Sequence, residues 1–98
     1  MNVKVPLTSI GNARVFFSRL GYHAERNGSY AKRVGGGVFP RYHVYVEAQG
    51  DQVRVSLHLD AKAPTYEGTS AHAGEYDGPL IEAEMQRITD AIGGVRPV

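Results

Sequence analysis

Hydrophobic and polar residues alternate strictly along two neighbouring segments, residues 40–49 and residues 52–60, which Gly50 and Asp51 join. Such alternation predicts an antiparallel hairpin of two half-buried strands, because successive side chains of a strand point to opposite faces. The apolar face of this hairpin contains Tyr42, Val44, Val46 and Ala48 opposite Val53, Val55, Leu57 and Leu59. A shift of one residue would set apolar side chains opposite polar ones, so the pattern determines the register.

The polar face of the same hairpin carries its ionisable residues. In the predicted register His43 faces His58, and Glu47 faces Arg54 as an opposite-charge cross-strand pair. Asp60 ends the second strand, within reach of the two histidines. We therefore expect a catalytic or binding site on this face.

Two other segments show the spacing of amphipathic helices. The first ends just before Gly21 and begins at a Thr8 or Ser9 cap, with the apolar residues Ile10, Ala13, Phe16, Phe17 and Leu20. The second begins near Pro79, with Asp77 or Gly78 as its cap, and ends at Gly93-Gly94. Its apolar stripe consists of Ile81, Met85, Ile88 and Ile92.

A second, shorter hairpin is predicted at Asn27-Gly28, a strong tight-turn signal between residues 22–26 and residues 29–34. The predicted register pairs Glu25 with Tyr30 and His23 with Lys32. The element order is then α-β-β-β-β-α. We expect a two-layer α+β sandwich, one domain over residues 1–98, with a four-stranded antiparallel sheet and both helices on its apolar face.

The composition narrows the function classes. The 98 residues include no cysteine, which excludes disulfide scaffolds, thiolate metal sites and a cysteine nucleophile. No apolar run is long enough to cross a bilayer, and the first residues lack the apolar stretch of a signal peptide. We therefore expect a cytoplasmic protein that does not contact membranes.

The charges are unevenly distributed along the chain. Residues 1–54 contain eight Lys or Arg and three Asp or Glu, whereas residues 55–98 contain three and seven. A basic half can indicate a nucleic-acid-binding face, and it can equally lie against the acidic half and be neutralised. A sequence pI near 8.1 favours neutralisation, because it is below the range of dedicated nucleic-acid-binding domains.

The segment 61–78 has no helical or strand period, and a loop of this length is usually functional or disordered. If it returns over the polar sheet face, His72 joins His43, His58 and Asp60 as the ligands of a divalent metal, with zinc the best fit. Glu75 would then serve as the general base of a hydrolase acting on a phosphate-containing substrate.

Two readings need no metal. The histidines can act as general acid and base, or the chain can be a non-catalytic RNA- or DNA-binding module. In the first case Arg41 or Arg54 would hold the phosphate. In the second the nucleic-acid or phosphate contacts are assigned to Arg41, Arg54, Lys32 and Arg33. A structural role, in which the loop is simply packed and the histidines are hydrogen-bonded, is the remaining alternative. The sequence does not define the oligomeric state.

The second half of the chain resembles a family of small bacterial proteins, a domain of unknown function. Its members share a hairpin of the RFHLY…NLHLD kind followed by an AHSGEYDG-like segment. The matching segments here are 41–45, 56–60 and 71–78. The resemblance implies family membership and no mechanism, and it marks His43, His58, Asp60, His72, Glu75 and Asp77 as signature positions.

The first half is similar, more loosely, to HicA-type toxins, which have a double-stranded-RNA-binding-like fold. Leu20-Gly21-Tyr22 and the segment 27–30 carry the likeness. Those toxins place a catalytic histidine just after the Gly-Ser of this turn, where this chain has Tyr30. The resemblance therefore implies an α/β sandwich more than it implies a ribonuclease.

Overall fold

A long hairpin is the centre of the structure. In the computed structural model, which describes residues 1–60, 74–75 and 78–93, β4 (Arg41–Gln49) pairs with β5 (Gln52–Asp60) along its whole length. The register is the predicted one, with His43 opposite His58 and Glu47 opposite Arg54. The strict alternation of apolar residues thus determines both strands and their pairing.

The fold is α+β, with an antiparallel sheet that is larger than predicted. The strand order is β1-β5-β4-β3-β2, in which β1 (Asn2–Pro6), β2 (His23–Ala24) and β3 (Tyr30–Arg33) flank the central hairpin. A sixth short strand, β6 (Gly74–Glu75), pairs with the end of β5. The prediction of four strands is wrong because β6 has only two residues and because that prediction does not count the short alternation of Val3 and Val5 in β1 as a strand.

The N-terminal helix is also divided. The sequence predicts one helix up to Leu20, but the structure has α1 (Leu7–Ile10) and α2 (Ala13–Arg19). Gly11 adopts a φ of 68°, which breaks the helix, and the side chain of Asn12 caps α2 by accepting from the N–H of Val15 at 3.0 Å. Neither Thr8 nor Ser9 is the cap of α2.

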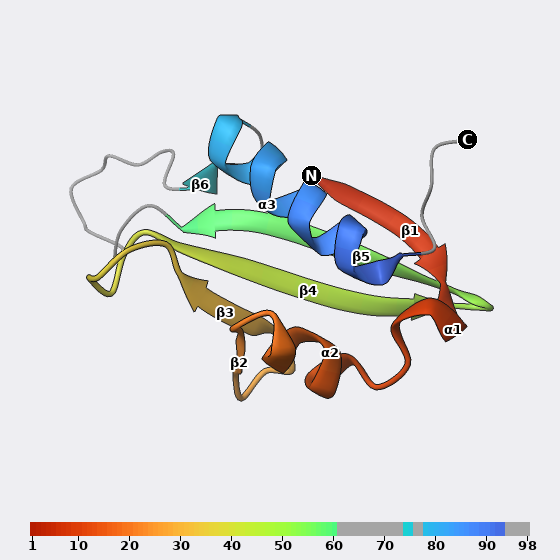
Figure 1. Cartoon of the computed structure of the whole chain (residues 1–98). Coiled ribbons are helices and arrows are strands. Elements are labelled where there is room, and N and C mark those ends of the chain that lie inside the picture. The colour runs from red at the N-terminus through yellow and green to blue at the C-terminus, as the bar shows by residue number, and fades with distance from the viewer. Residues whose placement is uncertain (61–73, 76–77, 94–98) are drawn as a thin grey trace.

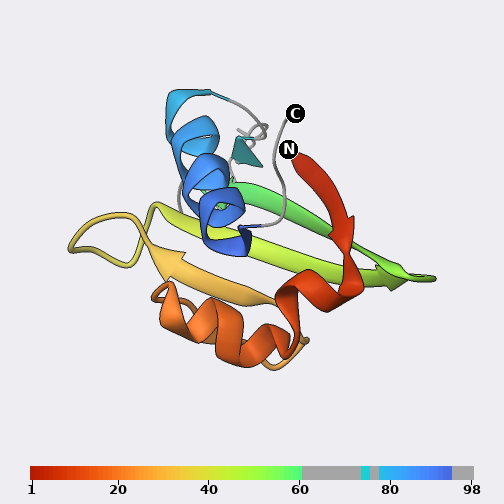
Figure 2. The same cartoon turned by 45° about the vertical axis from the view of Figure 1, so that its right-hand side comes forward.

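Helices α2 and α3 (Pro79–Ile92) lie on the same side of the sheet (Figures 1 and 2) and share one core with its apolar face. The predicted stripe of α3 is buried throughout, and Gly78 and Gly93 bound this helix. On α2, Phe17 is fully buried and stacks on Tyr30 of β3, with ring centroids 5.2 Å apart. No helix of the described residues is long and apolar enough to cross a membrane.

The β2–β3 hairpin differs from its prediction by one residue. His23 pairs with Ala31 and Ala24 with Tyr30, because the turn contains three residues between Glu25 and Ser29 rather than two. Gly28 supplies the positive φ, 91°, that such a turn requires. The shift places His23 in the same row across the sheet as His43 and His58.

A polar cluster, Tyr22–Glu84–Arg87, connects the helices beneath the sheet. Tyr22 and Glu84 are buried, whereas the Arg87 side chain is 42% exposed. Glu84, only 5% exposed, accepts from the Tyr22 hydroxyl at 2.6 Å and from two nitrogens of Arg87 at 2.9 and 2.8 Å. Arg87 also donates to the carbonyl oxygen of Leu20 at the end of α2. Burial and the Glu84 hydrogen bond raise the pKa of Tyr22, and the same carboxylate raises the pKa of Arg87.

Candidate functional site on the open sheet face

The face of the sheet opposite the helices carries the ionisable residues, and no helix of the described segments covers it. One row runs across four strands, from His23 on β2 through Ala31 on β3 to His43 and His58. The prediction that this face would hold the histidine pair is borne out by the register. The sequence did not place His23 in this row, because its position depends on the length of the turn between β2 and β3.

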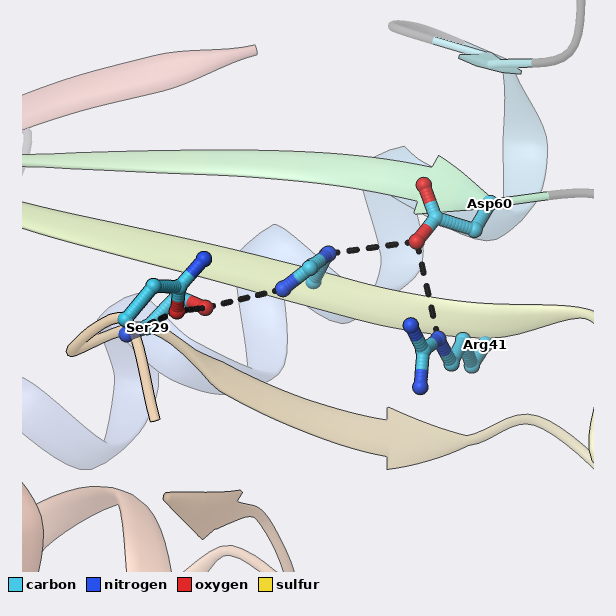
Figure 3. A network of polar contacts seen from close by, with 5 residues as sticks. Ser29, Arg41 and Asp60 are labelled. Carbon is cyan, nitrogen blue, oxygen red and sulfur yellow. Dashed lines mark hydrogen bonds and ion pairs between the residues drawn. The ribbon is translucent and has the colours of Figure 1, made fainter. Parts of the chain in front are cut away.

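A chain of polar contacts, the Ser29–His43–Asp60–Arg41 network, crosses this face (Figure 3). Ser29 Oγ lies 2.9 Å from His43 Nε2, and His43 Nδ1 lies 3.1 Å from Asp60 Oδ2. The same carboxylate oxygen is 3.5 Å from Arg41 Nε, an ion-pair contact. The network thus runs from the turn between β2 and β3 to the far end of β5.

The direction of these hydrogen bonds follows from Asn27. Its Oδ1 accepts from both the N–H of Ser29 at 3.0 Å and the hydroxyl of Ser29 at 2.6 Å. The single hydroxyl proton of Ser29 is therefore donated to Asn27, and Ser29 Oγ acts as an acceptor toward His43 Nε2. The Asp60 carboxylate can only accept, so the hydrogen bond at Nδ1 runs from the imidazole ring to Asp60.

This arrangement looks like a Ser–His–Asp nucleophile relay but lacks two requirements of one. A nucleophilic serine must be reachable and must give its proton to the histidine. Ser29 is 1% exposed, and its hydroxyl proton goes to Asn27 instead. We therefore interpret the network as a clamp that fixes the β2–β3 turn and orients His43.

The described residues gather only part of the predicted metal site. They contain no group of three or more His, Asp or Glu side chains placed to hold a metal ion. Both ring nitrogens of His43 already have polar partners, and His72 lies outside the described residues. The backbone of Glu75 pairs with Leu59, whose side chain belongs to the apolar face, whereas Asp60 pairs with Gly74.

An aromatic cluster, His43–Tyr45–His58, occupies the middle of the open face. The Tyr45 ring centroid lies 4.9 Å from that of His43 and 5.4 Å from that of His58, where the rings meet edge to face. Tyr45 is nevertheless 42% exposed. Burial, the N-terminal amine of Met1 and His43 lower the pKa of His58, against an opposing effect of Asp60.

Of the four predicted phosphate contacts, three lie near one another and Arg54 lies apart. Arg33 and Arg41 are direct register partners on the open face. Lys32 instead pairs with Tyr42 of the apolar face, and its ammonium lies 5.8 Å from that ring. Arg54 lies opposite Glu47 near the other end of β5, about 20 Å along the strand from Asp60.

A pocket of about 210 Å³ opens beside the Arg33–Arg41 pair. It is lined by His23, Glu25, Ala31, Lys32, Arg33, Val38 and Arg41. Of the residues predicted as phosphate contacts, three line this pocket and Arg54 does not. The Asn27-Gly28 turn signal and the strand alternation together could have located this pocket, if the length of the turn had been known.

No protein-family model matches the chain, and neither a curated protein nor a solved structure matches it significantly. The resemblances to the bacterial domain of unknown function and to HicA-type toxins therefore stay predictions.

Proposed function

We propose that the open sheet face binds single-stranded nucleic acid without catalysing its cleavage. The observation that carries the proposal is the position of Tyr45, which stays 42% exposed in the centre of a sheet face that the described helices leave uncovered. An aromatic ring on such a face is a platform on which a base can stack, a recurring mode of single-strand recognition.

The charges around Tyr45 support the same function. The described cationic side chains on the open face are Lys4, Arg33, Arg41 and Arg54, and the anionic ones are Glu25, Glu47 and Asp60. The surplus is positive before any histidine is counted. Arg33 is exposed and has no ion pair with a described residue, so it can contact a phosphate without giving up another partner.

The test is fluorescence anisotropy with a labelled single-stranded oligonucleotide of about 10 nucleotides, titrated across a salt series. We expect Tyr45→Ala to weaken binding by about 1–3 kcal/mol, the usual contribution of one stacked base. Leu80→Ala is the matched control, because Leu80 on α3 is 45% exposed and lies on the helical side. Equal affinities for the two variants would contradict the proposal.

Arg41→Gln examines the electrostatic part of the same proposal. Loss of one phosphate contact should lower the slope of log affinity against log salt by about 0.7 for a single strand. Arg19→Gln, on the last turn of α2, is the charge-matched control and should leave the slope unchanged. A wild-type affinity that does not vary with salt would exclude phosphate contacts altogether.

A zinc-dependent hydrolase using His43, His58, His72, Asp60 and Glu75 is the second candidate, and it ranks lower because His43 would first have to release a ring nitrogen. Its test is metal content of tag-free protein. Stoichiometric zinc that is lost in His58→Ala would favour the hydrolase. Metal-free protein whose melting temperature does not respond to added zinc would remove it.

A further inference from the structure

The pocket beside the Arg33–Arg41 pair has a defined floor and walls. Ala31, 5% exposed, forms the floor, and its small side chain leaves space between the row neighbours His23 and His43. Arg33 and Arg41 line the side formed by β3 and β4. Val38, which is 56% exposed, contributes from the connection between these strands.

The two guanidinium groups of this wall are unequally neutralised. Arg33 and Arg41 are direct cross-strand partners, and like charges in such a pair are unfavourable unless an anion lies near them. Asp60 contacts Arg41 alone, at 3.5 Å. A second anion beside Arg33 would relieve the repulsion, and guanidinium groups are well suited to bind two oxygens of one phosphate.

Glu25 makes the pocket more selective than a simple cationic patch. It lines the pocket from the β2 side, where a carboxylate would repel a bare polyanion. A carboxylate accepts hydrogen bonds from hydroxyl groups, as acidic residues do for ribose in nucleotide-binding sites. The matching ligand therefore has a phosphate on one side and a sugar hydroxyl on the other.

The size of the pocket limits how much of a ligand it can hold. Its volume of about 210 Å³ is smaller than the sites of roughly 300–1,000 Å³ that enclose whole small molecules. It therefore suits a phosphate with part of its sugar, while the base remains outside on the sheet face. Tyr45 lies two residues beyond His43 on the same face of β4, which is where such a base could continue.

We propose that this pocket binds the terminal phosphorylated sugar of a nucleotide, with Arg33 and Arg41 on the phosphate and Glu25 on a sugar hydroxyl. The inference rests on the proposed nucleic-acid function and specifies which part of the strand is recognised. The same chemistry is offered by the phosphorylated end of an RNA strand and by a free mononucleotide.

The experiment compares three oligouridine RNAs of about 10 nucleotides, with a 5′ phosphate, with a 3′ phosphate, or with hydroxyls at both ends. Wild-type protein should bind one phosphorylated strand about tenfold more tightly than the hydroxyl strand, the value of one charge-assisted contact. Arg33→Gln should abolish this ratio. Arg54→Gln is the matched control, because Arg54 lies near the start of β5, away from the pocket. It should lower all three affinities and preserve the ratio.

Two further arms identify the ligand source and the role of Glu25. Titration with uridine monophosphate and with its deoxy analogue measures whether the pocket binds a free nucleotide. Glu25→Gln should reduce any preference for the ribonucleotide while leaving the dependence on the terminal phosphate intact. If the wild type binds the free nucleotide and Arg33→Gln does not, the pocket is assigned to mononucleotides.

The outcomes separate this inference from the proposed function. If Tyr45→Ala weakens RNA binding but the terminal phosphate and Arg33→Gln have no effect on the ratio, the inference is wrong and the nucleic-acid function survives. If no oligonucleotide binds but uridine monophosphate binds in an Arg33-dependent way, the pocket survives and the nucleic-acid function is wrong. Absence of all binding overturns both.

Discussion

Two polar networks lie on opposite sides of the same sheet, and they differ in how completely they are satisfied. In the Tyr22–Glu84–Arg87 cluster, a carboxylate that is 5% exposed receives three hydrogen bonds from its partners. The Ser29–His43–Asp60–Arg41 network instead ends at an arginine beside a pocket, next to Arg33, which has no ion pair within the described part of the chain.

The difference indicates what each network does. A network built on a buried carboxylate, with both oxygens hydrogen-bonded, fixes the packing of the elements that supply its members, here α2, α3 and the start of the β2 hairpin. A network that ends at a pocket retains charge for a ligand. We therefore assign stability to the helical side and binding to the sheet side, and each prediction below tests that division.

The largest effect is expected for Glu84→Ala. Removal of this carboxylate leaves the Tyr22 hydroxyl and the inner nitrogens of Arg87 without their acceptor. The Arg87 side chain is 42% exposed and can turn to water, so the main cost is the lost acceptor of the buried Tyr22 hydroxyl. The free energy of unfolding should therefore fall by about 2–3 kcal/mol in urea denaturation. Gln86→Ala, exposed on the same helix, should change it by less than about 0.5 kcal/mol. Equal losses would show that the cluster does not hold the helices.

Ser29→Ala should cost less, about 1–2 kcal/mol, since it leaves His43 Nε2 without an acceptor in a buried position. This variant separates two roles of Ser29. A structural role predicts a loss of unfolding free energy, whereas a nucleophilic role predicts a loss of activity. If the protein has a hydrolytic activity that Ser29→Ala eliminates without unfolding it, our interpretation of the Ser29–His43–Asp60–Arg41 network is wrong.

Tyr22→Phe removes one hydrogen bond from the helical cluster and keeps the ring. We expect a loss of about 1.5 kcal/mol, because the hydrogen bond is to a charged acceptor. Its nucleic-acid affinity at 25 °C should equal that of the wild type. A large drop in affinity with an unchanged unfolding free energy would reverse the roles assigned to the two sides.

The smallest effect concerns pH. The pKa of His58 is lowered in the folded state by burial, by the amine of Met1 and by His43, while Asp60 opposes the shift. The unfolded chain, with an ordinary histidine pKa near 6.5, therefore binds the proton more readily. The contribution of His58 to stability is complete above about pH 6.5 and decreases as the pH falls through that value.

The variant that isolates this contribution is His58→Gln. Urea midpoints measured at about pH 7.5 and pH 5.5 should fall less in His58→Gln than in the wild type. A steeper fall in the variant would mean that His58 is stabilised in its charged form.

The sequence predicted the parts of the fold that a long pattern determines. Strict alternation fixed the β4–β5 register and with it the opposition of His43 and His58, and the apolar stripe located α3. Strand β6 contains two residues, too few for a period, whereas the alternation of Val3 and Val5 with polar neighbours could have predicted β1. The division between α1 and α2 depends on Gly11 and Asn12, where local backbone conformation prevails over apolar spacing.

The candidate site was predicted less completely, for a related reason. The location of His43, His58, Asp60 and Arg41 follows from the long hairpin, whereas His23 and Ser29 depend on one additional residue in a short turn. The burial of Glu84 on α3 has no signal in the sequence pattern. Only the packing of α3 against Tyr22 shows that it is buried.

The most direct test of the division between the two sides is a titration of ¹⁵N-labelled protein with single-stranded RNA, followed by amide chemical shifts. We predict that the shifts concentrate on β3, β4 and β5 around Arg33 and Tyr45, and that amides of α2 and α3 remain unchanged. Shifts centred on α2 and α3, or no shifts at millimolar RNA, would contradict the assignment of ligand binding to the sheet face.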